Sequence, residues 1–91
     1  MKAANDDLSL KLRALSDPVR RQILSLLAPR GMCAADLQRR IGLAQPTISH
    51  HMRILCEAGL VQGQKLGTWM WYRRDEAALR NLADQIKAFC E

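Results

Sequence analysis

The sequence predicts a mainly α-helical domain with one small β-hairpin, and three observations lead to this prediction. Apolar residues recur at helical spacing in five separate segments. The segment "TWMWY" alternates in the manner of a strand, and it follows a Gly-Thr pair that lies near the turn of a hairpin. The chain of 91 residues has the length of one domain. We therefore expect a single domain over residues 1–91, with about five helices.

The first two helices are expected in the N-terminal third of the chain. In "NDDLSLKLRAL", Leu8, Leu12 and Leu15 share one face of a helix that covers residues 5–15 approximately. "SDPVRRQILSLLA" predicts the second helix, because Asp17 can cap it and Pro18 suits its first position. "PRG" then stops this helix. Its buried stripe is predicted to be Val19, Ile23, Leu26 and Leu27.

Two further helices are separated by the short join "GLA". "CAADLQRRIG" predicts a helix that ends at Gly42, and "AQPTISHHMRILCEAG" predicts one that ends at Gly59. A short join that begins with glycine is typical of a helix-turn-helix. With the hairpin that follows, this arrangement predicts a winged helix-turn-helix.

The last helix, "DEAALRNLADQIKAFCE", is expected to be capped by Asp75. Its apolar stripe is Leu79, Leu82, Ala83, Ile86, Phe89 and Cys90. The terminal helices, at about residues 5–15 and 75–90, carry more apolar surface than so small a core covers. We expect them to form the interface of a homodimer; the alternative is that they close over the core of their own subunit.

The net charge of +5 is concentrated in the middle of the chain. Residues 18–74 hold nine Lys and Arg side chains against only Asp36 and Glu57, whereas the ends are neutral or acidic. A basic middle predicts contact with a polyanion such as nucleic acid. The alternative is a solvated basic surface.

Other classes of protein find little support in the sequence. No apolar run approaches the roughly 18–20 residues that cross a bilayer, so we expect no membrane partner. The N-terminus has no signal-peptide core, which predicts a cytoplasmic protein. No paired carboxylates, Gly-rich phosphate loop or Cys-His pair at useful spacing point to an enzyme.

The fourth predicted helix has the two faces that a DNA-reading helix needs. At about 100° per residue, Ile48, Met52 and Leu55 point inward. Glutamine can pair with adenine and arginine with guanine, while Ser, Thr and His can bond to bases or phosphates. The predicted DNA contacts from this helix are Gln45, Pro46, Thr47, Ser49, His50 and Arg53.

The two adjacent histidines do not predict a metal site. Neighbouring residues of a helix point about 100° apart, so His50 and His51 are poorly placed to chelate one ion. We expect His51, at the edge of the inward face, to be packed and hydrogen-bonded.

Basic residues of the hairpin are expected to lie against the DNA backbone. Lys65, Arg73 and Arg74 would meet phosphate, which gives affinity without sequence information. Trp69 and Trp71 are predicted to be packing residues, with base stacking as the weaker alternative.

Over nearly its whole length the chain resembles the ArsR/SmtB family of bacterial winged-helix repressors. The runs that carry the resemblance are "LRALSDPVRRQILSLL", "AADLQRRIGLAQPTISHHMRILCEAGLV" and "KLGTWMWYR". The resemblance implies a homodimer joined through its first and last helices, bound to one double-stranded operator and released by an inducer. It also implies DNA contacts from Gln45, Thr47, Ser49 and His50. One departure is Ala44, where the family often has a capping Ser or Thr.

The resemblance also raises the question of a metal-sensing or thiol-sensing site. Arsenic and metal sensors of the family carry a Cys-x-Cys-Asp-Leu box, which here reads "CAADL", so that Cys33 matches and Ala35 replaces the second thiol. The family's metal site on the last helix needs His, and none follows His51. Thiol sensors pair a cysteine of the last helix, which Cys90 resembles, with one where this chain has Ser25.

Three cysteines still match the number of thiolates that As(III) or Sb(III) takes. Cys33 would lie at a helix N-terminus, where the dipole favours thiolate, and Cys90 lies near the accessible chain end. Cys56 is predicted to be a buried small residue, and Cys33 could instead only fill a capping position, with Asp36 three residues later. The alternatives to a thiol-dependent inducer are another ligand, no ligand, or a winged helix that binds only protein.

Overall fold

The computed structural model describes residues 6–27 and 30–91 of the chain. A start of the first helix at residue 5 and a stop of the second helix at Pro29 therefore lie outside the described residues. The elements, in chain order, are α1 (Asp7–Leu15), α2 (Pro18–Leu27), β1 (Met32–Cys33), α3 (Ala34–Ile41), α4 (Gln45–Glu57), β2 (Val61–Leu66), β3 (Trp69–Arg74), α5 (Glu76–Lys87) and the short 3₁₀ helix η2 (Ala88–Cys90).

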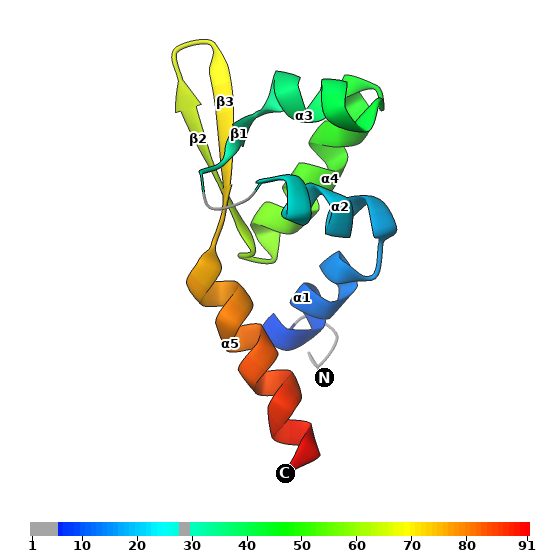
Figure 1. The fold of residues 1–91 in the computed structure, drawn as a ribbon, viewed down its shortest axis with the longest axis vertical. Coiled ribbons are helices and arrows are strands. Elements are labelled where there is room, and N and C mark those ends of the chain that lie inside the picture. Colours follow the sequence, from blue (N-terminus) through cyan, green and yellow to red (C-terminus); the bar gives the residue numbers. More distant parts are fainter. Residues whose placement is uncertain (1–5, 28–29) are drawn as a thin grey trace.

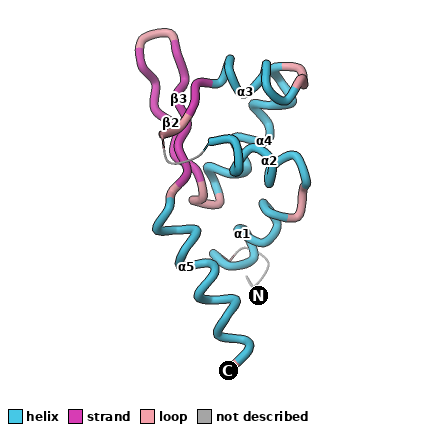
Figure 2. The backbone as a smooth tube through the Cα atoms, viewed as in Figure 1, coloured by secondary structure: helices cyan, strands magenta, loops and turns pink. Residues whose placement is uncertain are grey.

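The predicted helix-turn-helix and hairpin both form, and they lie at the same end of the molecule (Figure 1). Figure 2 shows the β2–β3 hairpin as a projection from the helical body, and we call this hairpin (residues 61–74) the wing. α5 leads from the base of the wing to the opposite end of the molecule, where the C-terminus lies.

The core lies between α2, α3, α4 and the segment that follows α4. Its largest fully buried side chains are Ile23, Leu27, Leu37, Met52, Leu55 and Leu60. α5 contributes only one buried side chain, Leu82, whereas Ile86 is 44% and Phe89 76% exposed. Most of the predicted stripe of α5 is therefore uncovered in one subunit.

The face of α1 that carries Leu8, Leu12 and Leu15 is only partly covered in one subunit. The buried residues of α1 are Lys11 and Ala14, while Leu12 is 45% exposed. Ala14 is small enough to bring α1 close to the body, and the ammonium group of Lys11 reaches back along the helix to Asp7. Leu12, like Ile86 and Phe89 of α5, is therefore left exposed in one subunit.

The wing belongs to a three-stranded antiparallel sheet in the order β1-β3-β2. In β3, Tyr72 and Trp71 pair with Met32 and Cys33 of β1. We did not predict β1, because two residues are too few to show a strand period. The hairpin itself follows the prediction, since Gly67 and Thr68 form the turn between the paired ends of β2 and β3.

A buried arginine joins three of the helices. The guanidinium group of Arg20 in α2 donates from Nε to the Ala14 carbonyl (2.7 Å) and from Nη2 to the Arg13 carbonyl (3.1 Å). Its Nη1 lies 3.2 Å from Nδ1 of His51 in α4. Because the last carbonyls of a helix lack partners within it, Arg20 satisfies the end of α1 and ties it to α4. The prediction that His51 is packed and hydrogen-bonded is confirmed.

Asp17 caps α2 as predicted. Its carboxylate accepts hydrogen bonds from the backbone N–H groups of Val19 (2.9 Å) and Arg20 (3.1 Å). Partial burial raises the pKa of Asp17, but the Arg20 N–H and the charges of His51 and Arg20 outweigh it and hold that pKa below its ordinary value. The carboxylate therefore stays ionised beside the Arg20 guanidinium.

A second arginine, Arg74, anchors the base of the wing. Its Nη1 donates to the carbonyl of Leu24 (3.1 Å), and its Nε donates to a carboxylate oxygen of Glu76 (2.7 Å). The expectation that Arg74 meets phosphate is therefore wrong. The Leu24 carbonyl in α2 and the Glu76 carboxylate in α5 occupy its guanidinium group, and the Arg74 side chain is only 22% exposed.

The approach of Gly31 to β3 yields a test of this packing. Gly31 has φ of +85°, and a Cβ added there would lie 2.5 Å from both Cγ of Arg73 and the backbone oxygen of Tyr72. We expect Gly31→Ala to lower the free energy of unfolding by roughly 3–4 kcal/mol, because a backbone atom cannot move aside. Urea denaturation followed by circular dichroism measures this loss.

The matched control is Gly42→Ala. Gly42 has a similar φ of +81°, but nothing lies within 4 Å of its added Cβ. This variant should lose only the strain of a left-handed alanine, about 1–2 kcal/mol. Equal losses in the two variants would show that the contact between Gly31 and β3 does not matter.

Candidate nucleic-acid interface

α4 has one buried and one open face. Ile48, Met52 and Leu55 are each no more than 2% exposed, and His51 beside them is 9% exposed. These four side chains fix the rotation of the helix about its axis, so that the remaining side chains point outward. All the residues predicted to contact DNA from this helix are exposed, and we call them the outer face of α4: Gln45, Pro46, Thr47, Ser49, His50 and Arg53.

The outer face of α4 is held together by two hydrogen bonds along the helix. Nε2 of Gln45 donates to Oγ of Ser49 (2.6 Å). The Gln45 amide keeps its second N–H and its oxygen free, which are the two groups that pair with adenine. Its position is thus defined before any DNA contact is made.

His50 and Arg53 form the second pair on this face. Nη2 of Arg53 lies 3.3 Å from Nδ1 of His50. Since arginine can only donate, Nδ1 of His50 is the acceptor in this contact. This contact leaves Nε2 of His50 as the ring nitrogen that can bond to a base edge or a phosphate.

The N-terminus of α4 lacks a side-chain cap. Ala44 occupies the capping position in extended conformation and makes no side-chain hydrogen bond to the helix. Pro46, in the first turn, has no N–H to satisfy. Ala44, which stands where the family often has a capping Ser or Thr, therefore leaves α4 without a side-chain cap. Backbone N–H groups stay open at this end of the helix, which is the end that usually reaches base edges.

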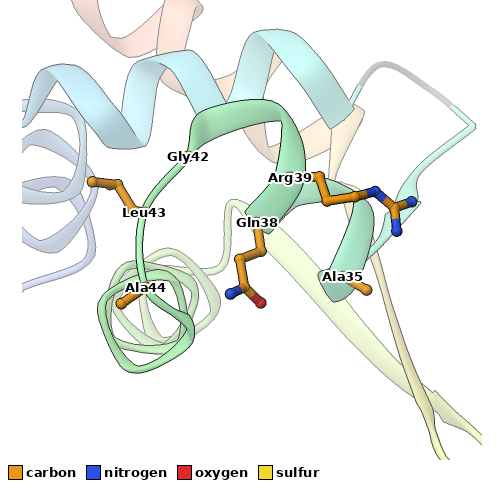
Figure 3. Close-up of a pocket in the computed structure, with 6 residues that line it drawn as sticks. All are labelled: Ala35, Gln38, Arg39, Gly42, Leu43 and Ala44. Carbon is orange, nitrogen blue, oxygen red and sulfur yellow. The ribbon is translucent and has the colours of Figure 1, made fainter.

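A shallow pocket of about 590 Å³ lies beside this N-terminus, between α3 and α4 (Figure 3). Figure 3 shows Gln38 extending from α3 toward the gap in front of Ala44, while Arg39 extends to the other side. Arg39 forms an ion pair with Asp36. We did not predict Gln38 or Arg39 as candidate DNA contacts, although the first helix of a helix-turn-helix commonly crosses the DNA backbone.

The wing presents two of its three basic residues. Lys65 and Arg73 are exposed as predicted, and between Val61 and Arg74 the wing holds no carboxylate. Trp71 is half-buried, and its indole N–H donates to the carbonyl of Arg30 (3.3 Å). Trp69 is 59% exposed, so the prediction that it is a packing residue is wrong.

The fold does not bring the three cysteines together. Cys33 is buried at the end of β1, Cys56 is half-buried in α4 and Cys90 is exposed in η2. Within residues 6–27 and 30–91 no three His, Cys, Asp or Glu side chains are grouped to hold a metal ion. One subunit therefore does not form a three-thiolate site for As(III) or Sb(III), and a thiol-dependent inducer stays a prediction.

The surroundings of the individual thiols differ from those that activate cysteine. Cys33 holds the capping position of α3, but its side chain makes no capping hydrogen bond, and Asp36 pairs with Arg39 rather than with the backbone of Cys33. Burial, with the neighbouring charge of Glu57, raises the pKa of the Cys56 thiol. Cys56 is thereby disfavoured as a thiolate ligand.

The uncapped start of α4 leads to a prediction about stability. Ala44→Thr supplies a hydroxyl that can accept from the open N–H groups, so we expect the free energy of unfolding to rise by about 0.5–2 kcal/mol. Ala44→Val has the same shape without the hydroxyl and should give no such gain. Thermal or urea denaturation compares the two variants. A gain shared by Val would assign the effect to packing, and the absence of any difference would show that Ala44 is not a limiting cap.

Within the described residues, no helix reaches the length and apolarity that a membrane crossing requires.

Comparisons with known proteins agree with this geometry. Residues 17–62 match the family described as "Bacterial regulatory protein, arsR family". The chain is 39% identical over 80 residues to an arsenical resistance operon repressor of Staphylococcus aureus, in an alignment that covers 88% of this chain and 77% of that protein.

Solved structures show the same fold. An ArsR-like transcriptional regulator from Rhodococcus superposes with a TM-score of 0.83 at 29% identity, covering 96% of this chain and 82% of that one. A homodimeric winged helix-turn-helix DNA-binding domain from Mycobacterium bovis gives a TM-score of 0.78 at 31% identity, covering 94% and 82%. The predicted fold class is confirmed. With α2 to α4 inside the family match and the wing in place, this chain belongs to the ArsR family of bacterial winged-helix transcriptional regulators.

Proposed function

We propose that this protein is a dimeric repressor that binds a two-fold operator, with α4 of each subunit in the major groove. The outer face of α4 carries this proposal. It combines exposed amide, hydroxyl, imidazole and guanidinium groups, and it holds no carboxylate that would repel DNA. In a two-fold dimer the two copies of α4 read half-sites about one helical turn apart. Such a regulator acts in the cytoplasm by binding, and no enzymatic step is part of its action.

Base edges and phosphates are assigned to different residues. Gln45, Thr47, Ser49 and His50 contact bases, while Arg53 and Pro46 lie at the border of the same surface. Lys65 and Arg73 of the wing contact phosphate, and Arg39 of α3 does so from the other side of the helix-turn-helix. The base contacts are assigned to α4 because the face of this helix that burial leaves open is the one that carries Gln45, Thr47, Ser49 and His50.

The dimer interface is assigned to α1 and α5. Leu12, Ile86 and Phe89 are large apolar side chains that one subunit leaves 44–76% exposed. α5 extends away from the body of the protein (Figure 1), and a helix in this position gains little from its own core. The related domain from Mycobacterium bovis is homodimeric, which supports the same assembly for this chain.

The nature of the inducer does not follow from the relatives. An arsenical resistance operon repressor is among them, but one subunit of this protein does not assemble the thiolates that As(III) requires. We therefore propose repression without assigning an arsenic-binding step to it.

Substitutions on α4 and in the wing should affect DNA binding in different ways. We expect Gln45→Ala, and likewise His50→Ala, to reduce the preference for the operator over random DNA by about 1–3 kcal/mol, because base contacts are lost. Arg73→Ala should weaken binding to both DNAs alike and lower the salt slope by about 1. Fluorescence anisotropy with DNA from upstream of the protein's own gene, titrated at several salt concentrations, measures both effects.

The same titrations test the rival function, a winged helix that binds only protein. That function predicts no operator preference even at low salt, once several candidate operators have been tried. An unchanged ratio of operator to random binding in Gln45→Ala would remove the assignment of base contacts to the outer face of α4. A loss in Arg73→Ala confined to the operator would contradict its role at phosphate.

The proposed dimer interface predicts the effect of a charge on α5. We expect Ile86→Lys to weaken dimerisation at least about 100-fold, since a two-fold interface loses the burial of Ile86 twice. Asp84→Lys is the matched control, because Asp84 lies about 160° away around the helix. Sedimentation velocity over a concentration series measures the dissociation constants. Equal effects of the two changes, or a dimer in Ile86→Lys, would place the interface elsewhere.

A further inference from the structure

The tip of the wing carries an exposed apolar pair that neither the core nor the proposed dimer interface uses. Leu66 and Trp69 are 47% and 59% exposed. They are paired across the hairpin on either side of the turn, so both side chains lie on the same face of the sheet. Large apolar side chains that are adjacent and uncovered indicate a contact surface.

The uncovered part of the wing begins at a defined place. Trp71 lies on the same face as Trp69, two residues along β3, and its indole N–H is bound to the carbonyl of Arg30. Gly31 lies close against Trp71 and Arg73. This segment leads into β1, which runs along the edge of β3 beside Trp71 and Tyr72, whereas Trp69 beyond it stays open. The wing therefore has a supported base and an apolar tip.

Charge and position identify the occupant of this tip as DNA. Residues 61–74 hold no carboxylate; the exposed cation Lys65 is adjacent to Leu66, and the exposed cation Arg73 lies four residues from Trp69, nearer the base of the wing. The tip lies at the same end of the molecule as the helix-turn-helix (Figure 1). When α4 occupies the major groove, a projection at that end reaches the adjoining minor groove, which is about 6 Å wide. A surface without carboxylates does not repel the phosphates of DNA, and the positive charges of Lys65 and Arg73 attract them.

We propose that Leu66 and Trp69 enter the minor groove beside each half-site as an apolar wedge that opens a base step and bends the operator. Apolar side chains in the minor groove partly unstack a base step and bend the duplex toward the major groove. Flexible pyrimidine–purine steps such as TA and CA are the easiest to open. The wedge therefore adds sequence preference outside the bases that α4 reads. This inference rests on the proposed operator binding.

The test combines a DNA-bending assay with substitutions that keep the strand. In the double variant Leu66→Thr with Trp69→Thr, threonine retains a high strand propensity, so the hairpin can still form. Gln64→Thr, on the same face of β2, is the matched control. Energy transfer between dyes at the two ends of the operator reports bending, and 2-aminopurine at the flanking step reports unstacking.

We expect the parent protein and Gln64→Thr to bend the operator and to raise the 2-aminopurine emission. The double variant should do neither, and its affinity for an operator with TA flanks should fall on the order of tenfold, to that for GC flanks. Its discrimination against substitutions in the half-sites should be unchanged, because α4 still reads them. Trp69 in the parent should also become shielded from acrylamide on binding the operator.

Other outcomes overturn the proposal in distinguishable ways. If the double variant bends the operator and prefers TA flanks as the parent does, the wedge is wrong while operator binding stands. If the double variant no longer forms a dimer by sedimentation, the occupant of the tip is a second subunit. If the parent protein prefers no operator, the proposed function fails, and the wedge fails with it.

Discussion

The orientation of the outer face of α4 depends on the buried guanidinium group of Arg20. This group binds the last carbonyls of α1 and the ring of His51, and it lies beside the ionised carboxylate of Asp17. A buried charge of this kind is tolerated only when its donors are satisfied, so the three helices are held in one arrangement. With His51 fixed inward, the preceding residue, His50, lies about 100° around the helix and is exposed. The rotation of α4 is thus set by hydrogen bonds as well as by the packing of Ile48, Met52 and Leu55.

Much of the fold follows from the sequence, because its signals are local. Helical spacing of apolar residues predicted all five α-helices, and Asp17, Gly42 and Asp75 mark helix ends through their own side-chain or backbone chemistry. The outer face of α4 was also predictable, since a rotation of about 100° per residue separates the buried from the exposed positions. These predictions need no knowledge of what lies across the core.

The features that escaped prediction are those set by distant partners. β1 exists only because Met32 and Cys33 meet β3 some forty residues later. The role of Arg74 depends on the carbonyl of Leu24, which no local pattern connects to it. The exposure of Leu12 and of Trp69 likewise depends on where the body of the protein ends. The cysteines show the same limit, because their number matched a metal site that their positions in one subunit do not form.

The joint between β1 and α3 has a mechanical consequence. Cys33 is at once the last residue of β1 and the residue before the first turn of α3, so no flexible linker separates the sheet from the helix-turn-helix. Arg74 fixes the other end of the sheet to α2. These two connections therefore fix the distance between α4 and the tip of the wing. In the proposed complex, DNA whose two grooves are spaced differently from α4 and the tip of the wing would have to be deformed before both could bind.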